Sequence, residues 1–166
     1  MSQQLTILEL SKKLGKILFQ HKYRCVVAES CTGGSLAAAI TDIPGSSQWF
    51  DRGFVTYSNE SKTEVLSVPS HMIIEEGAVS EATALAMAHG ALTASSADVS
   101  AAITGVAGPG GGRVDKPVGT VWIAWAGHMF PSHAQCYLFA GDREAIRHQA
   151  VRMALDGLIE VMKFTG

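Results

Sequence analysis

Cys25-Val26-Val27-Ala28-Glu29-Ser30-Cys31-Thr32-Gly33-Gly34 joins a short apolar run to a pair of glycines. Four apolar residues in a row, at positions 25–28, are typical of a strand that is buried on both faces. A helix of small residues is predicted to follow, from about residue 34 to residue 41. The stretch therefore predicts a buried strand that turns directly into a helix, which is a unit of layered α/β folds.

The segments around this unit continue the alternation of strands and helices. Residues 3–21 predict an amphipathic helix, because Ile7, Leu10 and Leu14 recur at helical spacing. Gly157 lies in the apolar stripe of the last predicted helix and indicates close backbone packing there. The remaining predicted elements are strands over 53–57, 99–103, 118–126 and 135–139, and helices after residue 58, over 80–95 and over 143–163.

This order predicts an α/β fold in which helices cover both faces of a mostly parallel sheet. A hairpin after residue 118 would make the sheet mixed. The chain has 166 residues, of which 47% are hydrophobic and 17% charged, so a single folded domain over 1–166 is expected. The formal net charge of −2 argues against a protein that binds nucleic acid by neutralising many phosphates, but not against binding of a mononucleotide.

The cysteines and histidines indicate neither a disulfide scaffold nor a metal site. Three scattered cysteines without C-x-x-C spacing fit a reducing cytoplasm. No signal peptide and no membrane span is expected, so the predicted location is the cytoplasm. The six histidines lack metal-ligand spacing, so we predict no metal; they are His21, His71, His89, His128, His133 and His148.

Three unusual segments follow predicted strands: 29–34, 57–62 and 104–112. In layered α/β folds, ligands bind beyond the carboxyl ends of the strands. Each segment is a weak signal by itself. Together they predict one site at one edge of the sheet.

Ser30 and Lys62 are the candidate nucleophile and base. Ser30 lies between the strand and the helix, where backbone N–H groups of Thr32–Gly34 would receive a developing oxyanion. Its position alone fits a helix N-cap equally well, and caps are commoner. Lys62 would serve as a base if burial lowers its pKa, although most lysines are solvated surface residues.

Tyr57, Thr104 and Arg143 complete the candidate set from the residues. Tyr57 would pass a proton or hold substrate; the alternative is an ordinary half-buried strand tyrosine. The glycine-dense loop after Thr104 would form an anion-binding nest, or simply a mobile surface loop. Arg143 would pair with a phosphate, or lie at the surface as a helix-end charge.

Four motifs and one further segment occur in a fixed order along the chain. They are Val27-Ala28-Glu29-Ser30-Cys31-Thr32-Gly33-Gly34; Gly53-Phe54-Val55-Thr56-Tyr57-Ser58-Asn59 with Lys62; Gly77-Ala78-Val79-Ser80; Thr104-Gly105-Val106-Ala107-Gly108-Pro109-Gly110-Gly111; and Pro117-Val118-Gly119-Thr120-Val121.

These motifs strongly resemble the CinA C-terminal domain family, over nearly the whole chain. The resemblance implies a three-layer α/β/α domain with a mixed sheet, and no metal or cofactor. It further implies an amidohydrolase that converts nicotinamide mononucleotide and water to nicotinate mononucleotide and ammonia. Carried over by motif, the catalytic residues are Ser30 as nucleophile and Lys62 as base, completed by Tyr57 and Thr104. The expected substrate-binding residues are Thr32, Gly33, Gly34, Asn59, Gly105, Ala107, Gly108 and Arg143.

Two other functions stay open at this point. One is a nucleotide-binding module that uses the same cleft without catalysis, and the other is an amidase or esterase for a different heterocyclic amide. Besides the small nucleotide substrate, the expected partner is a second copy of the chain, since the apolar first and last helices offer an interface for a homo-oligomer such as a dimer.

Overall fold

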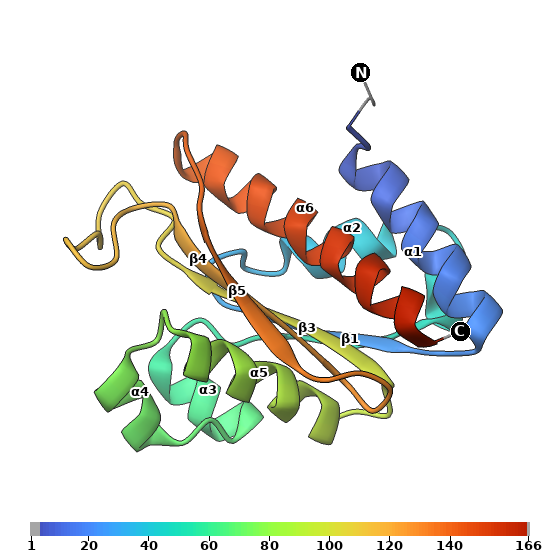
Figure 1. Ribbon diagram of the computed structural model, residues 1–166, viewed down its shortest axis with the longest axis horizontal. Helices are drawn as coiled ribbons and strands as arrows, with labels where there is room; N and C mark the ends of the chain where they lie inside the picture. Colours follow the sequence, from blue (N-terminus) through green and yellow to red (C-terminus); the bar gives the residue numbers. More distant parts are fainter. Residues whose placement is uncertain (1–3, 166) are drawn as a thin grey trace.

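The computed structural model describes residues 4–165 and places a five-stranded sheet between two layers of helices (Figure 1). Gln3, the expected first residue of the first helix, lies outside the described residues. Besides its helices and strands, the chain has short 3₁₀ turns at residues 46–48 and 163–165. In chain order the helices and strands are α1 (Ile7–His21), β1 (Cys25–Glu29), α2 (Ser35–Thr41), β2 (Phe50–Val55), α3 (Asn59–Leu66), α4 (Ser70–Glu76), α5 (Glu81–Thr93), β3 (Val99–Gly105), β4 (Thr120–Gly127), β5 (His133–Leu138) and α6 (Arg143–Met162).

The sheet is mixed, in the order β2-β1-β3-β4-β5. β1 pairs in parallel with both β2 and β3, whereas β4 runs antiparallel to both β3 and β5. All strands except β4 therefore point the same way. The predicted three-layer fold is confirmed, and so is the hairpin that makes the sheet mixed.

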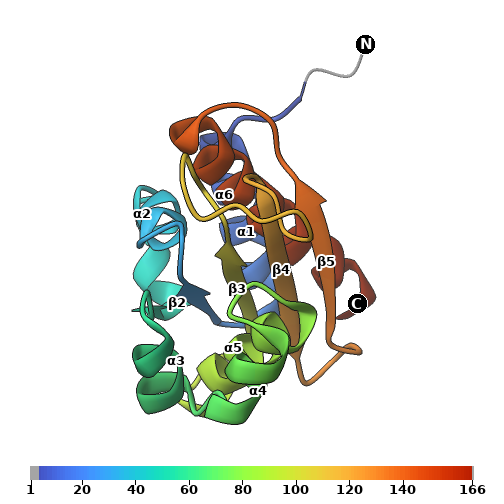
Figure 2. The same cartoon turned by 90° about the vertical axis from the view of Figure 1, so that its left-hand side faces the viewer.

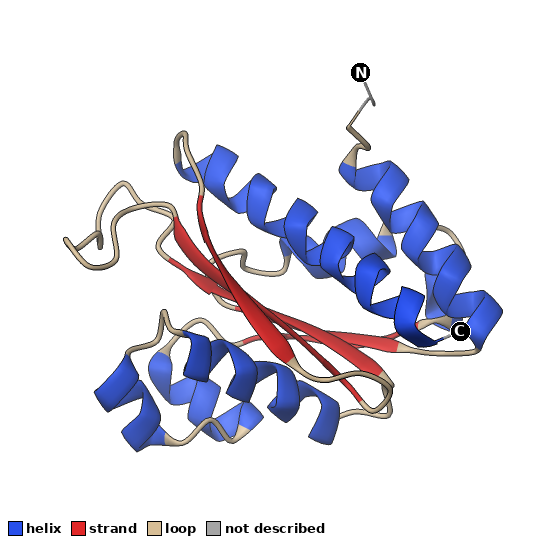
Figure 3. Ribbon diagram, in the orientation of Figure 1, coloured by secondary structure: helices blue, strands red, loops and turns tan. Residues whose placement is uncertain are grey.

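Each face of the sheet has its own layer of helices and its own core. α1, α2 and α6 cover one face, and α3, α4 and α5 cover the other (Figures 1 and 3). Seen from the side, the sheet separates the two layers (Figure 2). The alternation of side chains along the strands divides the core, since Val27 packs toward α1 and α6 while Val26 and Ala28 pack toward α5.

The apolar stripes of α1 and α6 are used inside the chain. Leu10, Leu14 and Leu18 of α1 are buried in the same core as the apolar face of α6. A Cβ atom on Gly157 of α6 would lie 2.1 Å from the indole ring of Trp125, which confirms the close packing expected there. The stripes are therefore part of the core, and a homo-oligomer formed through these helices stays a prediction.

Several local expectations differ from the structure. The first helix begins at Ile7, after the N-cap residue Thr6, so residues 4–6 are not helical as expected. β2 is Phe50–Val55 rather than 53–57, because this edge strand is half-exposed and its apolar pattern is weak. α4 was not predicted, since its seven residues are too short for a periodic stripe and its N-cap residue, Pro69, makes no side-chain cap. Within residues 4–165 no helix has the length and apolar character needed to cross a membrane.

Candidate active site

The three segments singled out in the sequence meet around one pocket of about 280 Å³ beyond the carboxyl ends of β1 and β3. Of the twelve expected site residues, nine line it, together with Cys31, Ala78, Val79, Val106, Gly110 and Gly111. Thr32, Gly33 and Gly34 do not line it. The nine are Ser30, Tyr57, Asn59, Lys62, Thr104, Gly105, Ala107, Gly108 and Arg143.

Lys62 is buried at the bottom of this arrangement, with 1% of its surface exposed. α3 carries it inward; this helix begins after Ser58, whose hydroxyl accepts from the Ser61 N–H at 3.1 Å. The Lys62 Nζ atom lies 3.0 Å from Ser30 Oγ. It also donates to the carbonyl oxygens of Thr56 at 2.9 Å and Tyr57 at 3.1 Å.

The charge state of Lys62 is governed by this burial. Removal of the amine from water lowers its pKa below the ordinary value of 10.5. No carboxylate forms an ion pair with it among the described residues. A buried amine without a carboxylate partner is suited to act as a base.

Ser30 is held by backbone contacts and does not cap α2. Its N–H donates to Ile103 O of β3, and its carbonyl accepts from the Gly33 N–H, both at 3.0 Å. The N-cap residue of α2 is Gly34. The hydroxyl of Ser30 is instead free to face Lys62, so the N-cap alternative for Ser30 is wrong.

Glu29 supplies the cap that Ser30 does not. Its carboxylate, 1% exposed, accepts from the backbone N–H groups of Leu36 at 2.8 Å and Ala37 at 3.0 Å. The first N–H groups of α2 are therefore occupied by an anion from the neighbouring residue of the strand. Among the described residues, the N–H groups of Cys31, Thr32 and Gly34 have no acceptor, and that of Cys31 belongs to the residue directly after Ser30.

Tyr57 and Arg143 meet at the exposed mouth of the pocket. The Tyr57 side chain is 58% exposed, and its phenol oxygen accepts from Arg143 Nη2 at 3.2 Å. Arg143 Nη1 also donates to Gly108 O at 2.8 Å. The structure thus brings the carbonyl of Tyr57, and not its phenol, to Lys62 and Ser30.

Thr104 and Asn59 line the pocket from two sides of β1. Thr104 lies in β3, and Asn59 follows β2. The buried Thr104 hydroxyl donates to Ala78 O at 2.8 Å, so it ties β3 to the segment that leads into α5. Asn59 is exposed at the first position of α3. Within residues 4–165, no three side chains of the metal-ligating types gather into a possible metal site.

Arg147 contacts the segment after Ser30, and the sequence analysis did not single it out. From α6, its Nε atom donates to Cys31 O at 3.1 Å, and its Nη2 atom donates to Thr32 O at 3.1 Å and Ser35 Oγ at 3.3 Å. A signal existed in the sequence: Arg143 and Arg147 are four residues apart and so share one face of the helix.

A three-layer α/β/α protein with a buried serine–lysine pair beyond its strands is the class that this fold and site define. The model of the CinA C-terminal domain matches residues 7–162, and the chain belongs to that family.

Relatives and solved structures agree with this membership. The chain is 49% identical over 157 residues to the nicotinamide-nucleotide amidohydrolase PncC of Pseudomonas putida, an alignment that covers 93% of this chain and 96% of the relative. It is 47% identical to the protein of that name from Escherichia coli K12, covering 92% of each. The crystal structure of the competence/damage inducible protein CihA from Agrobacterium tumefaciens superimposes with a TM-score of 0.92 at 42% identity, over 96% of this chain and 99% of that one.

Proposed function

We propose that this protein hydrolyses the carboxamide of nicotinamide mononucleotide to give nicotinate mononucleotide and ammonia. The observation that carries the proposal is the 3.0 Å contact between Ser30 Oγ and the buried Lys62 Nζ. Relatives that align with over nine-tenths of the chain are named nicotinamide-nucleotide amidohydrolase, which supports the choice of substrate.

In the proposed first step, the neutral amine of Lys62 takes the hydroxyl proton of Ser30 as Oγ attacks the carboxamide carbon. The carbonyl oxygen becomes an oxyanion that accepts from the Cys31 N–H. The Lys62 ammonium then returns the proton to the leaving nitrogen, and ammonia departs. Water hydrolyses the acyl group from Ser30 in a second round that Lys62 assists in the same way.

The nucleotide portion would lie along the glycine-dense loop and Arg143. The Arg143 guanidinium stands at the pocket mouth beside Gly108, where it can pair with a phosphate. Gly108 has φ +75°, and a Cβ there would lie 2.4 Å from the Val118 side chain. Any side chain is therefore excluded at Gly108, where the nucleotide would pass close to the backbone. A dimer and a cytoplasmic location stay predictions.

The test is incubation with nicotinamide mononucleotide, with ammonia and nicotinate mononucleotide quantified separately. Wild type is expected to release both in equal amounts, and Ser30→Ala neither. Ser47→Ala, an exposed serine outside the pocket, is the matched control and should keep full activity. Activity of Ser30→Ala near that of wild type would overturn the assignment.

The same samples separate the alternatives. A nucleotide-binding module would be stabilised thermally by nicotinamide mononucleotide without forming product. An amidase for another heterocyclic amide would show a higher kcat/KM for that compound in a substrate panel.

A further inference from the structure

We propose that Arg147 is a positioning residue that holds the Ser30 turn, defined as residues 30–34, in the geometry needed for attack. The inference rests on the proposed function, because it assigns Arg147 a part in the same reaction. Arg147 does not line the catalytic pocket, so it acts through the turn and not by touching substrate.

The Ser30 turn has few bonds of its own. Within the turn and to Ser35, its backbone contacts are Gly33 N–H to Ser30 O and Ser35 N–H to Thr32 O, both at 3.0 Å. At its two ends, Ser30 N–H donates to Ile103 O at 3.0 Å and Gly34 O accepts from Ala38 N–H at 2.9 Å, so the carbonyl of Cys31 in the middle has no backbone donor among the described residues. Gly33 and Gly34 have φ values of +57° and +100°, which glycine adopts without steric cost and which restrain the chain little. Such a turn needs contacts from outside to keep a single conformation.

Arg147 supplies those contacts from α6, more than 110 residues later in the chain. Its donors reach the carbonyls of Cys31 and Thr32, which belong to the two peptide planes after the one that joins Ser30 to Cys31. Holding these planes restrains the backbone of Cys31, and with it the directions of the Cys31 N–H and of Ser30. Hydrogen bonds from a charged guanidinium are stronger than neutral ones.

The guanidinium of Arg147 uses its donors on the carbonyl oxygens of Cys31 and Thr32. No carboxylate forms an ion pair with Arg147 in the described part of the chain. Two nitrogens of one planar guanidinium, Nε and Nη2, reach the two carbonyls, and their spacing is fixed by the plane of the group. The single Nζ atom of a lysine lacks this fixed fork.

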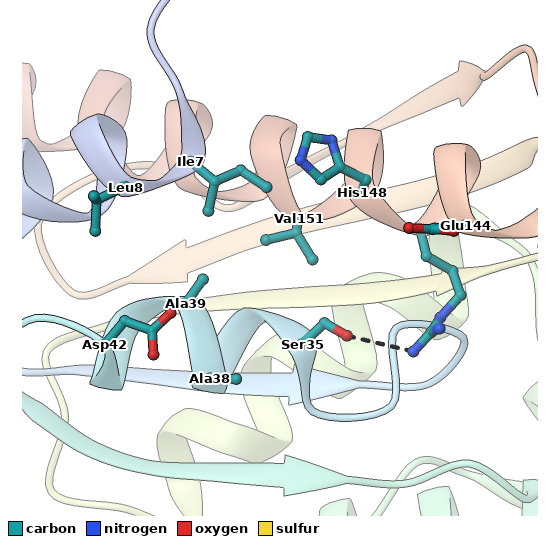
Figure 4. A pocket seen from close by; sticks show the side chains of 10 residues that line it. Ile7, Leu8, Ser35, Ala38, Ala39, Asp42, Glu144, His148 and Val151 are labelled. Carbon is teal, nitrogen blue, oxygen red and sulfur yellow. Dashed lines mark hydrogen bonds between the residues drawn. The ribbon is translucent and has the colours of Figure 1, made fainter.

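A second pocket gives access to this guanidinium. A cavity of about 520 Å³ between α1, α2 and α6 is lined by Arg147 and Ser35, and it shares no lining residue with the catalytic pocket. Figure 4 shows this pocket, with Ile7 and Val151 on its apolar side and the hydrogen bond to Ser35 drawn as a dashed line. If the side chain of Arg147 is removed, a free guanidinium ion can enter from this cavity without crossing the substrate site.

The experiment compares Arg147→Ala and Arg147→Lys with Arg152→Ala, which removes a guanidinium from the same helix outside both pockets. Arg147→Ala is expected to lower kcat about 10²-fold, the usual cost of a misplaced reacting group, with little change in KM. Guanidinium chloride at millimolar concentration should restore part of kcat in Arg147→Ala, whereas equal sodium chloride should not. Arg147→Lys should recover less than rescued Arg147→Ala, and Arg152→Ala should behave as wild type.

Hydrogen exchange provides a readout that does not depend on turnover. Amides of residues 30–34 should exchange faster in folded Arg147→Ala than in wild type, while those of β3 should not. If wild type releases no ammonia from nicotinamide mononucleotide, the proposed function fails, and the role of Arg147 is then judged by this exchange and by the rate at which a fluorophosphonate labels Ser30. The inference would be overturned by unchanged kcat, labelling and exchange in Arg147→Ala, or by equal rescue with sodium chloride. If Arg147→Ala does not fold, the same measurements on Arg147→Lys decide.

Discussion

Lys62 Nζ lies 3.0 Å from Ser30 Oγ, and its next neighbours are the carbonyl oxygens of Thr56 and Tyr57. A neutral amine has two N–H groups and one lone pair. The two carbonyls can take the two N–H groups, which leaves the lone pair for the hydroxyl proton of Ser30. In the proposed mechanism, the backbone after β2 thus turns the lone pair of the amine toward the serine.

Removal of the amine tests this base directly. Lys62→Met keeps the length and volume of the side chain, so the buried site stays filled. We expect kcat to fall at least about 10²-fold, the low end of what a general base contributes. The Thr56 and Tyr57 carbonyls lose their donor, which should cost about 1–3 kcal/mol of stability.

The measurement is ammonia release at saturating substrate, with urea unfolding to show that the variant is folded. Lys163→Met, an exposed lysine after α6, is the matched control and should retain wild-type kcat. Turnover by folded Lys62→Met within tenfold of wild type would exclude Lys62 as the base.

The lowered pKa of Lys62 predicts the direction of the pH dependence. The base must be neutral, so activity is lost as pH falls through the pKa of the folded enzyme and rises above it. Burial places that pKa below 10.5, and the rising limb of kcat/KM should lie below 10.5 as well. A limb centred at or above 10.5 in the measured pH–rate profile would contradict a buried neutral amine.

The lowered pKa of Lys62 also predicts how the stability of the fold depends on pH. The unfolded chain binds the Lys62 proton more tightly than the folded one, so the free energy of unfolding should rise with pH between the folded pKa and 10.5. Urea unfolding of wild type and Lys62→Met over this range should show that increment in wild type alone.

Tyr57→Phe separates the two roles of this residue. Its carbonyl contacts Lys62 and is unaffected by the change, whereas its phenol contacts Arg143 at the pocket mouth. We therefore expect kcat within about tenfold of wild type and a raised KM, as for loss of a binding contact. Arg143→Met should raise KM further, by about 10–100-fold if it pairs with the phosphate. A large loss of kcat in Tyr57→Phe would show that the phenol carries the proton.

Gly157→Ala tests the packing of α6 on the sheet. The added Cβ would lie 2.1 Å from the Trp125 ring, whose Nε1 donates to Ala154 O at 3.1 Å. Helix or ring must shift, which should lower the free energy of unfolding by about 1–3 kcal/mol. Gly110→Ala, where a Cβ meets nothing within 4 Å, is the control in the same urea titration and should change stability by less than about 0.5 kcal/mol. Equal stability of the two variants would contradict this packing.

Much of the fold was predictable because its signals are local. The strand of residues 25–28, the glycines after it and the long helix from residue 143 all follow from periodicity and turn chemistry. The half-exposed β2 and the short α4 were misplaced or missed, because neither carries a full period of apolar residues.

Nine of the residues that line the pocket were expected from the sequence, whereas the contacts that they make were not. Ser30, Lys62 and Thr104 could be found because carboxyl ends of neighbouring parallel strands converge. The cap on α2 could not be assigned to Glu29 instead of Ser30, since both residues have capping oxygens and only geometry separates them.

By itself, the sequence determined the order of strands and helices, the residues at the strand ends and the family. The tertiary structure alone decided that Lys62 is buried against Ser30, that the phenol of Tyr57 faces Arg143, and that Arg147 reaches the Ser30 turn. The reason is physical: element type follows from neighbours within a few residues, whereas these contacts join residues 32, 86 and 116 positions apart. Their distances depend on how the layers pack.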